Sequence, residues 1–331
     1  MSCAEVIDLT NESAGGSADR GVGRHFGLPN IGNTCYINST IQCLYNTRCF
    51  PRFVREHGGR LLNPFSPLRS KGSKEAYVEM MRWMKTDGVV PRDFRLTEQN
   101  DANEFCMHLL DFYLERLRVR APPYASMKDD LSNTSYEEFI ESCRRRWTET
   151  FSPIMPVVYA QTARITKCNL CENTCVNVET MPFIHIDSFD VKAGIREVFE
   201  SKRVPEWRCD ACGKTSDTNI TTLACVRPPQ LLMVCLNRFA RTPNMRMSIP
   251  RSLSMARFCV EREDHGDEIR YALRSTLNHR GSVHFGHYTA NIVLDKETVL
   301  KIDDEEVGKP KQVDEQDLKN AYILFYERVV R

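Results

Sequence analysis

The sequence predicts an α+β protein in which a helical segment is followed by a strand-rich one. From about residue 24 to 150, apolar residues recur at helical spacing; Ile37, Ile41 and Leu44, for example, fall on one face. After about residue 151, short β-branched runs between turn residues are typical of strands. With 331 residues, 41% of them hydrophobic, the chain can bury a sizeable core. The clearest strand candidates lie at 157–165, 174–178, 219–223, 230–236, 271–278, 287–294 and 321–328.

The charge of the chain is balanced, because 45 Lys and Arg residues face 44 Asp and Glu residues. Proteins that bind nucleic acids or membrane surfaces usually carry an excess of basic charge, so neither partner is expected. No apolar run approaches the roughly 20 residues that a bilayer span needs. The N-terminus lacks the basic segment followed by an apolar stretch that is typical of a signal peptide. We therefore expect an intracellular protein, cytoplasmic or nuclear.

Residues 1–23 are rich in Gly, Ser, Ala and charge, which predicts a disordered tail. Its one apolar cluster consists of Val6, Ile7 and Leu9, with Asp8 between them and further acidic residues close by. This cluster resembles a SUMO-interacting motif, in which a short apolar strand adds to the edge of the partner's sheet. Chance occurrence in a polar tail is the alternative.

A turn-rich loop runs into an amphipathic helix at residues 27–39, Gly-Leu-Pro-Asn-Ile-Gly-Asn-Thr-Cys-Tyr-Ile-Asn-Ser, and places Cys35 at the helix start. A helix N-terminus carries partial positive charge and unpaired N–H groups. It therefore favours a thiolate over a thiol and offers a hydrogen bond to a developing oxyanion. The alternative is that Cys35 is a small buried core residue, as most cysteines are.

A thiol nucleophile needs a base, and eight histidines are available. Two glycines loosen the loop in residues 279–288, His-Arg-Gly-Ser-Val-His-Phe-Gly-His-Tyr, so His287 stands at a loop-to-strand junction that can face a cleft. The next acidic run, Asp-Asp-Glu-Glu at 303–306, is by composition alone most often a solvated turn.

Four cysteines form two Cys-x-x-Cys pairs, Cys168 with Cys171 and Cys209 with Cys212, among strand-like segments. Two such pairs supply the four thiolates of a tetrahedral zinc site, which would be structural because no position is left for water. A redox role is less favoured, since two matched pairs are present and no βαβ pattern surrounds either. Cys175 lies near the first pair and could compete as a ligand, although the symmetric spacing of the two pairs leaves it outside the predicted set.

The order Asn-Ile-Gly-Asn-Thr-Cys-Tyr-Ile-Asn-Ser around Cys35 closely resembles the cysteine box of the ubiquitin-specific proteases. Gly-His-Tyr at 286–288 resembles the histidine box of that family. Gln-Asn-Asp-Ala-Asn-Glu-Phe at 99–105 resembles its internal Gln/Asp box, though imperfectly. The resemblance covers the chain from about residue 26 to the C-terminus.

This resemblance implies the roles of five residues. Cys35 would be the nucleophile, His287 the base and Asp303 the residue that orients the base. Asn30 would donate its side-chain amide to the oxyanion, alongside the Cys35 backbone N–H. Asp304 would assist that network or replace Asp303, and the sequence does not separate the two.

The same resemblance implies a papain-like fold within a catalytic domain at 24–331. A helical thumb would span about 24–150, zinc-tipped β fingers about 166–225, and a β-sheet palm about 151–165 and 226–331. The implied activity is hydrolysis of the isopeptide or peptide bond after the C-terminal glycine of ubiquitin, with ubiquitin and ubiquitinated proteins as partners and Zn²⁺ as a structural cofactor. Two alternatives stay open: an isopeptidase for SUMO or another ubiquitin-like protein, and a catalytically silent modifier-binding protein.

Overall fold

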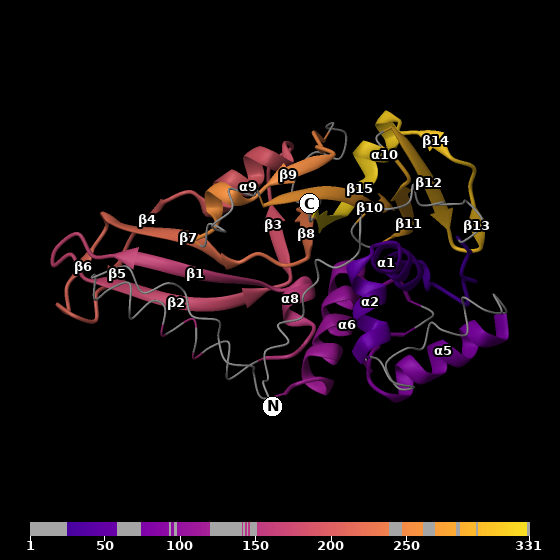
Figure 1. The fold of residues 1–331 in the computed structure, drawn as a ribbon, viewed down its shortest axis with the longest axis horizontal. Helices are drawn as coiled ribbons and strands as arrows, with labels where there is room; N and C mark the ends of the chain where they lie inside the picture. The colour runs from indigo at the N-terminus through magenta and orange to yellow at the C-terminus, as the bar shows by residue number, and fades with distance from the viewer. Residues whose placement is uncertain are drawn as a thin grey trace, which may run out of the picture.

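The computed structural model describes residues 25–57, 74–92, 94, 95, 98–119, 141, 143, 145, 151–237, 247–260, 269–282, 285–295 and 297–329. The predicted tail and its SUMO-type motif lie outside these residues. The helices are α1 (Cys35–Tyr45), α2 (Cys49–His57), α5 (Lys74–Thr86), α6 (Ala102–Arg116), α8 (Met155–Val158), α9 (Val191–Phe199) and α10 (Glu315–Asn320), with a 3-10 turn η2 (Ala256–Phe258). The strands are β1 (Ala160–Lys167), β2 (Thr174–Met181), β3 (Phe183–Ile186), β4 (Lys202–Val204), β5 (Trp207–Arg208), β6 (Thr215–Ser216), β7 (Asn219–Arg227), β8 (Leu231–Leu236), β9 (Ser252–Ser254), β10 (Arg270–Gly281), β11 (Gly286–Val293), β12 (Thr298–Asp303), β13 (Glu306–Val307), β14 (Lys311–Gln312) and β15 (Ala321–Arg328). This content confirms the predicted α+β class (Figure 1).

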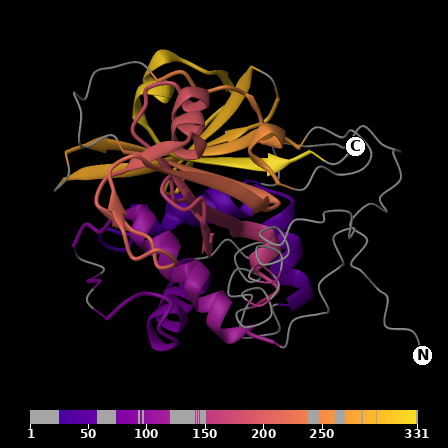
Figure 2. The same cartoon turned by 90° about the vertical axis from the view of Figure 1, so that its left-hand side faces the viewer.

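The helices α1, α2, α5 and α6 form the thumb, which lies on one side of the large sheet (Figure 2). Helix α6 begins after Asp101, whose side chain caps it by accepting hydrogen bonds from Asn103 N at 2.8 Å and Glu104 N at 3.1 Å. Helical spacing predicts one face for Phe105, Leu109 and Phe112; the first two are buried, whereas Phe112 is half-buried. The cap fixes the start of this helix close to the strands of the palm.

Helix α1 lies between the thumb helices α2 and α6 and the large sheet, and its residues from Cys35 to Leu44 are all buried. The sequence pattern predicts one buried face; the strands β10, β11 and β12 cover the other. The polar side chains of α1 therefore bond inside the protein. Ser39 Oγ donates to Cys35 O at 2.7 Å, and Gln42 Nε2 donates to Phe26 O at 2.7 Å. The helix that starts at Cys35 is thus held from both sides.

Among the described residues, nine strands form the palm, in the order β13-β12-β11-β10-β15-β8-β3, with β14 beside β12 and β9 beside β10. The last strand in the sequence, β15, lies in the middle of this sheet. Its side chains are buried on both faces: Ile323 and Phe325 belong to the core shared with the thumb, whereas Leu324 and Tyr326 belong to the core beneath α9. A strand covered on both faces reads as a continuous apolar run, which β15 does.

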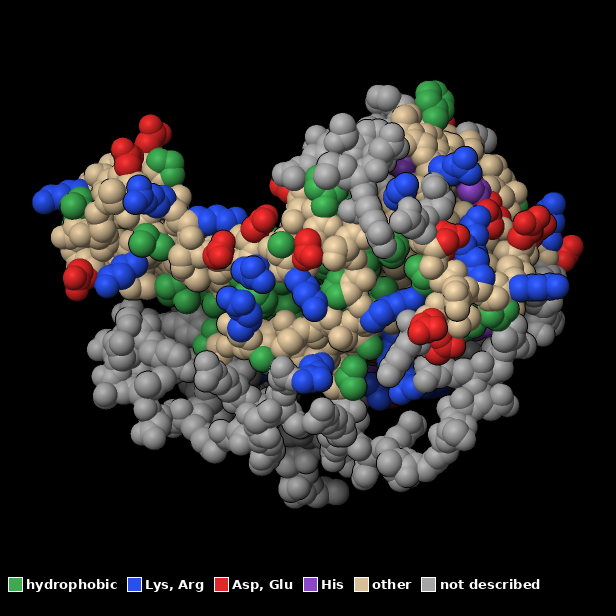
Figure 3. Space-filling view, turned by 90° about the horizontal axis from the view of Figure 1, so that it is seen from above, with side chains coloured by type: hydrophobic (Ala, Val, Ile, Leu, Met, Phe, Trp, Pro, Cys, Tyr) green, Lys and Arg blue, Asp and Glu red, His purple; other side chains and the backbone are tan. Residues whose placement is uncertain are grey.

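The sheet β2-β1-β7-β4 is antiparallel and extends away from the palm as the fingers, with the hairpin β5-β6 near its end (Figure 1). Strands β1 and β2 pair from Ala160 with Met181 to Lys167 with Thr174. On the face that Figure 3 shows, the basic and acidic side chains of the described residues are interspersed over the fingers and palm. This surface agrees with the balanced charge of the sequence.

Glu327, on β15, joins the palm to the thumb through a carboxylate that is only 4% exposed. Its Oε1 accepts hydrogen bonds from the backbone N–H groups of Arg48 at 2.6 Å and Cys49 at 2.8 Å, at the start of α2. Its Oε2 accepts from Arg274 Nε at 2.9 Å, on β10. A buried carboxylate needs such partners, so the two halves of the molecule are tied together at this point.

The predicted strand at 157–165 is wrong at its start. Val157 and Val158 belong to the short helix α8, and β1 begins at Ala160. Pro156 lies at the beginning of α8, where its fixed φ and missing N–H suit the first helical turn. The β-branched valines thus follow a helix-start signal that outweighs their strand preference.

None of the helices in the described part of the chain combines the length and apolar composition that a membrane crossing requires.

Candidate active site

Cys35 is the first residue of α1, and 4% of its surface is exposed. The loop before it is shaped by Asn30, whose Oδ1 accepts hydrogen bonds from Gly32 N at 3.3 Å and from Thr34 N at 3.1 Å. These bonds turn the chain into the helix, as asparagine does in tight turns. Because Cys35 opens the helix, its backbone N–H has no partner within the helix.

His287 is the second residue of β11, and Asp303 is the last residue of β12. The Nε2 atom of His287 lies 2.5 Å from Asp303 Oδ1. The Cys35 side chain is the other neighbour of the imidazole, since hydrogen bonding to it is the largest cause of the raised His287 pKa. Since Nε2 faces Asp303, Nδ1 is the ring nitrogen left for the thiol. The structure therefore brings together Cys35, His287 and Asp303, the three residues that the sequence singles out.

The surroundings of His287 stabilise its protonated form. Its pKa is raised to about 9, first by the hydrogen bond with Cys35, against the opposite effect of partial burial, and then by the bond to Asp303 and its charge. Partial burial alone would raise the pKa of Asp303, but hydrogen bonds from His287 and Lys301 lower it below its ordinary value. Lys301 Nζ lies 2.9 Å from Asp303 Oδ2. Asp303 is thus held on both of its oxygens.

Asp304 occupies a different position from its neighbour. Its Oδ2 accepts from Asn30 Nδ2 at 2.8 Å, its Oδ1 accepts from Asn38 Nδ2 at 2.8 Å, and its carbonyl accepts from Leu28 N at 2.8 Å. His287 Nε2 is 4.0 Å from Asp304 Oδ2, beyond hydrogen-bond distance. The backbone φ of Asp304 is 49°, in the left-handed region that aspartate tolerates better than most residues. This residue joins the loop before Cys35 to the palm.

Titration of the His287 side chain should separate the two aspartates. We expect a pKa near 9 in the wild type, a clear fall in Asp303→Asn, and a smaller change in Asp304→Asn, because only Asp303 bonds to the imidazole. NMR of the ring nitrogens across pH measures this directly. Equal falls in the two variants would contradict the assignment.

The same raised pKa has a consequence for stability. A histidine whose pKa is higher in the folded protein than its usual 6.5 stabilises the fold fully below about pH 6.5. That contribution is lost as the pH rises through about 9. Urea unfolding at pH 6 and pH 9 should therefore show a smaller pH dependence in Asp303→Asn than in the wild type.

Several residues of the site have no role predicted from sequence. Lys301 is two residues before Asp303 on β12, so the two side chains share one face of the strand, and that spacing is a signal that reveals the pair. Asn38 and Gln99 belong to the conspicuous segments of the sequence, but their partners lie in distant parts of the chain. Tyr77 donates a hydrogen bond to Asn38 Oδ1, and no local pattern indicates this.

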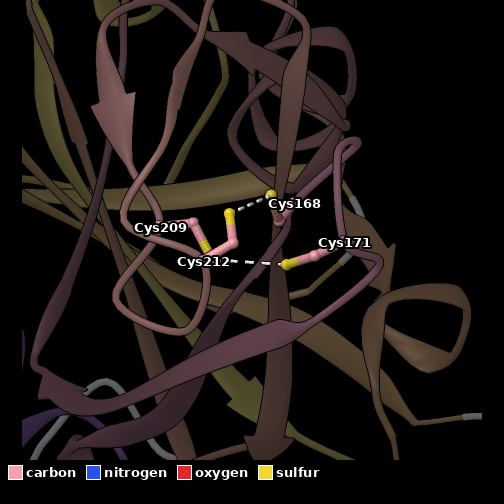
Figure 4. A group of neighbouring side chains, drawn as sticks. All are labelled: Cys168, Cys171, Cys209 and Cys212. Carbon is pink, nitrogen blue, oxygen red and sulfur yellow. Dashed lines mark hydrogen bonds between the residues drawn. The ribbon is translucent and has the colours of Figure 1, made fainter.

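The four predicted cysteines meet at the end of the fingers, and all four sulfurs lie within 4.8 Å of one another. Cys168 Sγ is 3.9 Å from Cys212 Sγ, and Cys171 Sγ is 3.7 Å from Cys209 Sγ (Figure 4). A tetrahedral ion with Zn–S bonds of about 2.3 Å would separate the sulfurs by about 3.8 Å. Cys175 lies on β2, outside this group. The donor set and its spacing therefore fit a zinc ion.

The two cysteine turns have the same backbone form. In each, the first cysteine donates its N–H to a carbonyl five residues on: Cys168 to Asn173 at 2.9 Å, and Cys209 to Lys214 at 3.0 Å. The residue after the second cysteine has a left-handed φ in both, 59° at Glu172 and 67° at Gly213. Two matching turns that each present two thiols are what a symmetric four-thiolate site needs.

The chain matches the model of the family described as ubiquitin carboxyl-terminal hydrolase over residues 26–326. It is 26% identical over 395 residues to ubiquitin carboxyl-terminal hydrolase 4 of Saccharomyces cerevisiae, covering 99% of this chain and 42% of the yeast protein. It is 26% identical over 363 residues to ubiquitin carboxyl-terminal hydrolase 21 of Homo sapiens, covering 92% of this chain and 61% of the human protein. The chain thus spans about two to three fifths of the length of these curated relatives.

Among solved structures, the chain resembles the SAGA DUB module of Ubp8, Sgf11, Sus1 and Sgf73 bound to monoubiquitin. The TM-score is 0.70 at 19% identity, covering 98% of this chain and 73% of that chain. A structure of the same module bound to ubiquitin aldehyde gives a TM-score of 0.67 at 18% identity, covering 94% of this chain and 71% of that chain. At these identities the likeness shows a shared fold.

Proposed function

Because the chain belongs to the ubiquitin carboxyl-terminal hydrolase family, we propose that it cleaves the peptide or isopeptide bond after the C-terminal glycine of ubiquitin. The observation that carries this proposal is the hydrogen-bonded series of Cys35, His287 and Asp303 between the thumb and the palm. A thiol nucleophile needs a base in contact with it, and the base needs a third group that orients it. Ubiquitin is the proposed partner, since the Ubp8 module of the same fold was solved with monoubiquitin bound.

In this mechanism the thiol proton of Cys35 resides on His287, so the sulfur attacks the carbonyl carbon of the terminal glycine as a thiolate, and the carbonyl electron pair moves to the oxygen. His287, protonated at neutral pH because its pKa is raised to about 9, gives its proton to the leaving lysine nitrogen as the C–N bond breaks. Water then attacks the thioester while His287 takes a proton from it. The C–S bond then breaks, ubiquitin leaves as a carboxylate whose acid proton passes to water, and the Cys35 thiolate and the protonated His287 are regenerated.

The oxyanion of this reaction would be stabilised by the backbone N–H of Cys35 and the side-chain amide of Asn30. Asn30 Nδ2 carries two hydrogens, and one of them bonds to Asp304 Oδ2. The second remains for the substrate, in an orientation that Asp304 fixes. One preorganised donor of this kind is typically worth roughly 3–4 kcal/mol of activation free energy. In this proposal Asp304 acts through Asn30, whereas Asp303 acts through His287.

A ubiquitin probe with an electrophile at its C-terminus tests the proposed activity. We expect a covalent adduct at Cys35, located by peptide mass spectrometry, that forms at least about tenfold faster than with a matched SUMO probe. Faster labelling by the SUMO probe would instead favour the SUMO-isopeptidase alternative, which the tail motif suggested. Labelling by neither probe would favour the catalytically silent alternative.

We also propose that the four fingertip cysteines hold a structural Zn²⁺, on the strength of the sulfur spacing and the matching turns. Bound there, the ion would join the turn after β1 to the β5-β6 hairpin and fix the shape of the fingers. An intracellular location fits this proposal, because a thiol nucleophile and thiolate ligands both need reduced cysteines. The fingers would then begin near residue 166 and end near residue 225.

A further inference from the structure

Gln99, in the loop before α6, forms hydrogen bonds in both directions with the backbone of Gly286. Its Nε2 donates to Gly286 O at 2.6 Å, and its Oε1 accepts from Gly286 N at 2.6 Å. Gly286 is the first residue of β11 and directly precedes His287. A side chain of the thumb therefore forms two hydrogen bonds with the palm backbone at the residue before His287.

The backbone groups of Gly286 are available because the neighbouring strand does not reach it. β12 pairs with β11 only along Ala290–Val293. On the other side Gly286 lies opposite Gly281 of β10, and the hairpin closes with Ser282 N donating to Phe285 O at 2.7 Å. Bonded and non-bonded pairs alternate in an antiparallel ladder, so Gly286 directs its N–H and C=O away from β10. A carboxamide has the same donor and acceptor as a peptide group, so Gln99 takes the place of the missing strand.

The Gly286 backbone is also closely packed. A Cβ atom at this position would lie 2.0 Å from His279 Nε2 and 2.9 Å from Arg280 O. The His279 ring in turn lies against Tyr288, with 4.5 Å between ring centroids. The start of β11 is thus packed against β10, while Gln99 holds its open edge.

The loop that carries Gln99 is itself fixed to both halves of the site. Asn100 Nδ2 donates to the hydroxyl of Tyr36 at 3.3 Å, beside the nucleophile on α1. Asp101 caps α6 and accepts a hydrogen bond from Tyr322 OH on β15 at 2.9 Å. Gln99 therefore has a supported position from which to hold Gly286, and the distance between the two halves is set locally.

We propose that Gln99 is a positioning residue that fixes the backbone before His287 and so holds the imidazole against Cys35. This inference rests on the proposed function only for its consequence in turnover. The His287 ring is 44% exposed, so packing alone does not fix it. A displacement of about 1 Å between reacting groups can cost on the order of 10²-fold in rate. We therefore expect Gln99→Ala to lower kcat about 10- to 100-fold and to change KM no more than about threefold.

Gln99→Glu gives a second, pH-dependent readout. An ionised carboxylate can accept from Gly286 N, but it has no hydrogen to donate to Gly286 O. Protonation near the usual glutamate pKa of about 4.3 restores that donor. The rate of Cys35 alkylation by iodoacetamide, relative to the wild type, should therefore recover as the pH falls from about 6 to about 4, whereas Gln99→Ala should show no recovery.

The control variant is Glu98→Ala, since Glu98 is the neighbouring residue and its side chain is 57% exposed and pairs with the exposed Arg95. It should behave as the wild type in all three assays of turnover, alkylation and thermal unfolding. The inference is overturned if Gln99→Ala turns over and is alkylated normally, if it raises KM alone, or if unfolding at the assay temperature accounts for its loss. If Gln99→Ala alters Cys35 alkylation but the wild type does not cleave ubiquitin, the proposed function is wrong and this inference still holds.

Discussion

The Cys35→Ala variant should lose hydrolysis of a fluorogenic ubiquitin C-terminal amide almost completely, with kcat/KM falling about 10⁴-fold or more. The substitution removes the sulfur that forms the acyl-enzyme, and no other described thiol has His287 as a hydrogen-bonding partner. Ubiquitin binding should change little, because only one buried atom is lost. Steady-state kinetics and titration calorimetry measure the two effects separately.

His287→Ala should cost about as much as Cys35→Ala, and the double variant little more, because nucleophile and base act as one unit. Cys259→Ala is the matched control: this thiol is half-buried and packs in the core beneath α9, on the other face of the palm. It should retain activity. Substantial turnover by Cys35→Ala would show that another residue is the nucleophile.

Removing two ligands from the fingertip should have the second large effect. In Cys168→Ser combined with Cys209→Ser, one cysteine is lost from each turn, and we expect zinc to fall from about one ion per chain to almost none. Structural zinc contributes directly to folding free energy, so the thermal unfolding temperature should fall by about 10 °C or more. Elemental analysis and calorimetry give the two values.

Cys175→Ser provides the matched control for this variant, since Cys175 is close in sequence to the first pair and lies on β2 outside the cluster. It should keep its zinc and its unfolding temperature. Hydrogen exchange should show the loss of protection in the double variant concentrated at β5, β6 and the adjoining ends of β1 and β7. A folded, active wild type that contains no metal would rule out the zinc proposal.

Sequence patterns were sufficient for the features that depend on neighbouring residues. The apolar spacing of α1, the continuous apolar run of β15 and the two Cys-x-x-Cys pairs all have local signals, and the structure places each as predicted. The strand predicted at 157–165 is wrong at its first residues, because Pro156 favours the start of a short helix there. The family resemblance placed Cys35 and His287 in one site, which no local pattern does.

The division between Asp303 and Asp304 could not be predicted, because the two residues have the same chemistry and adjacent positions. They are separated by the end of β12: Asp303 stays in the strand and faces His287, whereas Asp304 turns into a left-handed conformation and meets Asn30. The pairing of Gln99 with Gly286 joins distant segments of the chain in the same way. Such contacts depend on the assembled tertiary structure.

The central position of β15 also determines when the protein can become active during its synthesis. Its neighbours β8 and β10 pair with it rather than with each other, and Glu327 ties it to the start of α2. Cys35 is synthesised about 250 residues before His287. Synthesis of the stretch between them takes roughly 10–50 s at ordinary translation rates. During that time the thumb carries the proposed nucleophile without the proposed base. The candidate active site can therefore assemble only after β15 has been synthesised, because this strand completes the middle of the palm.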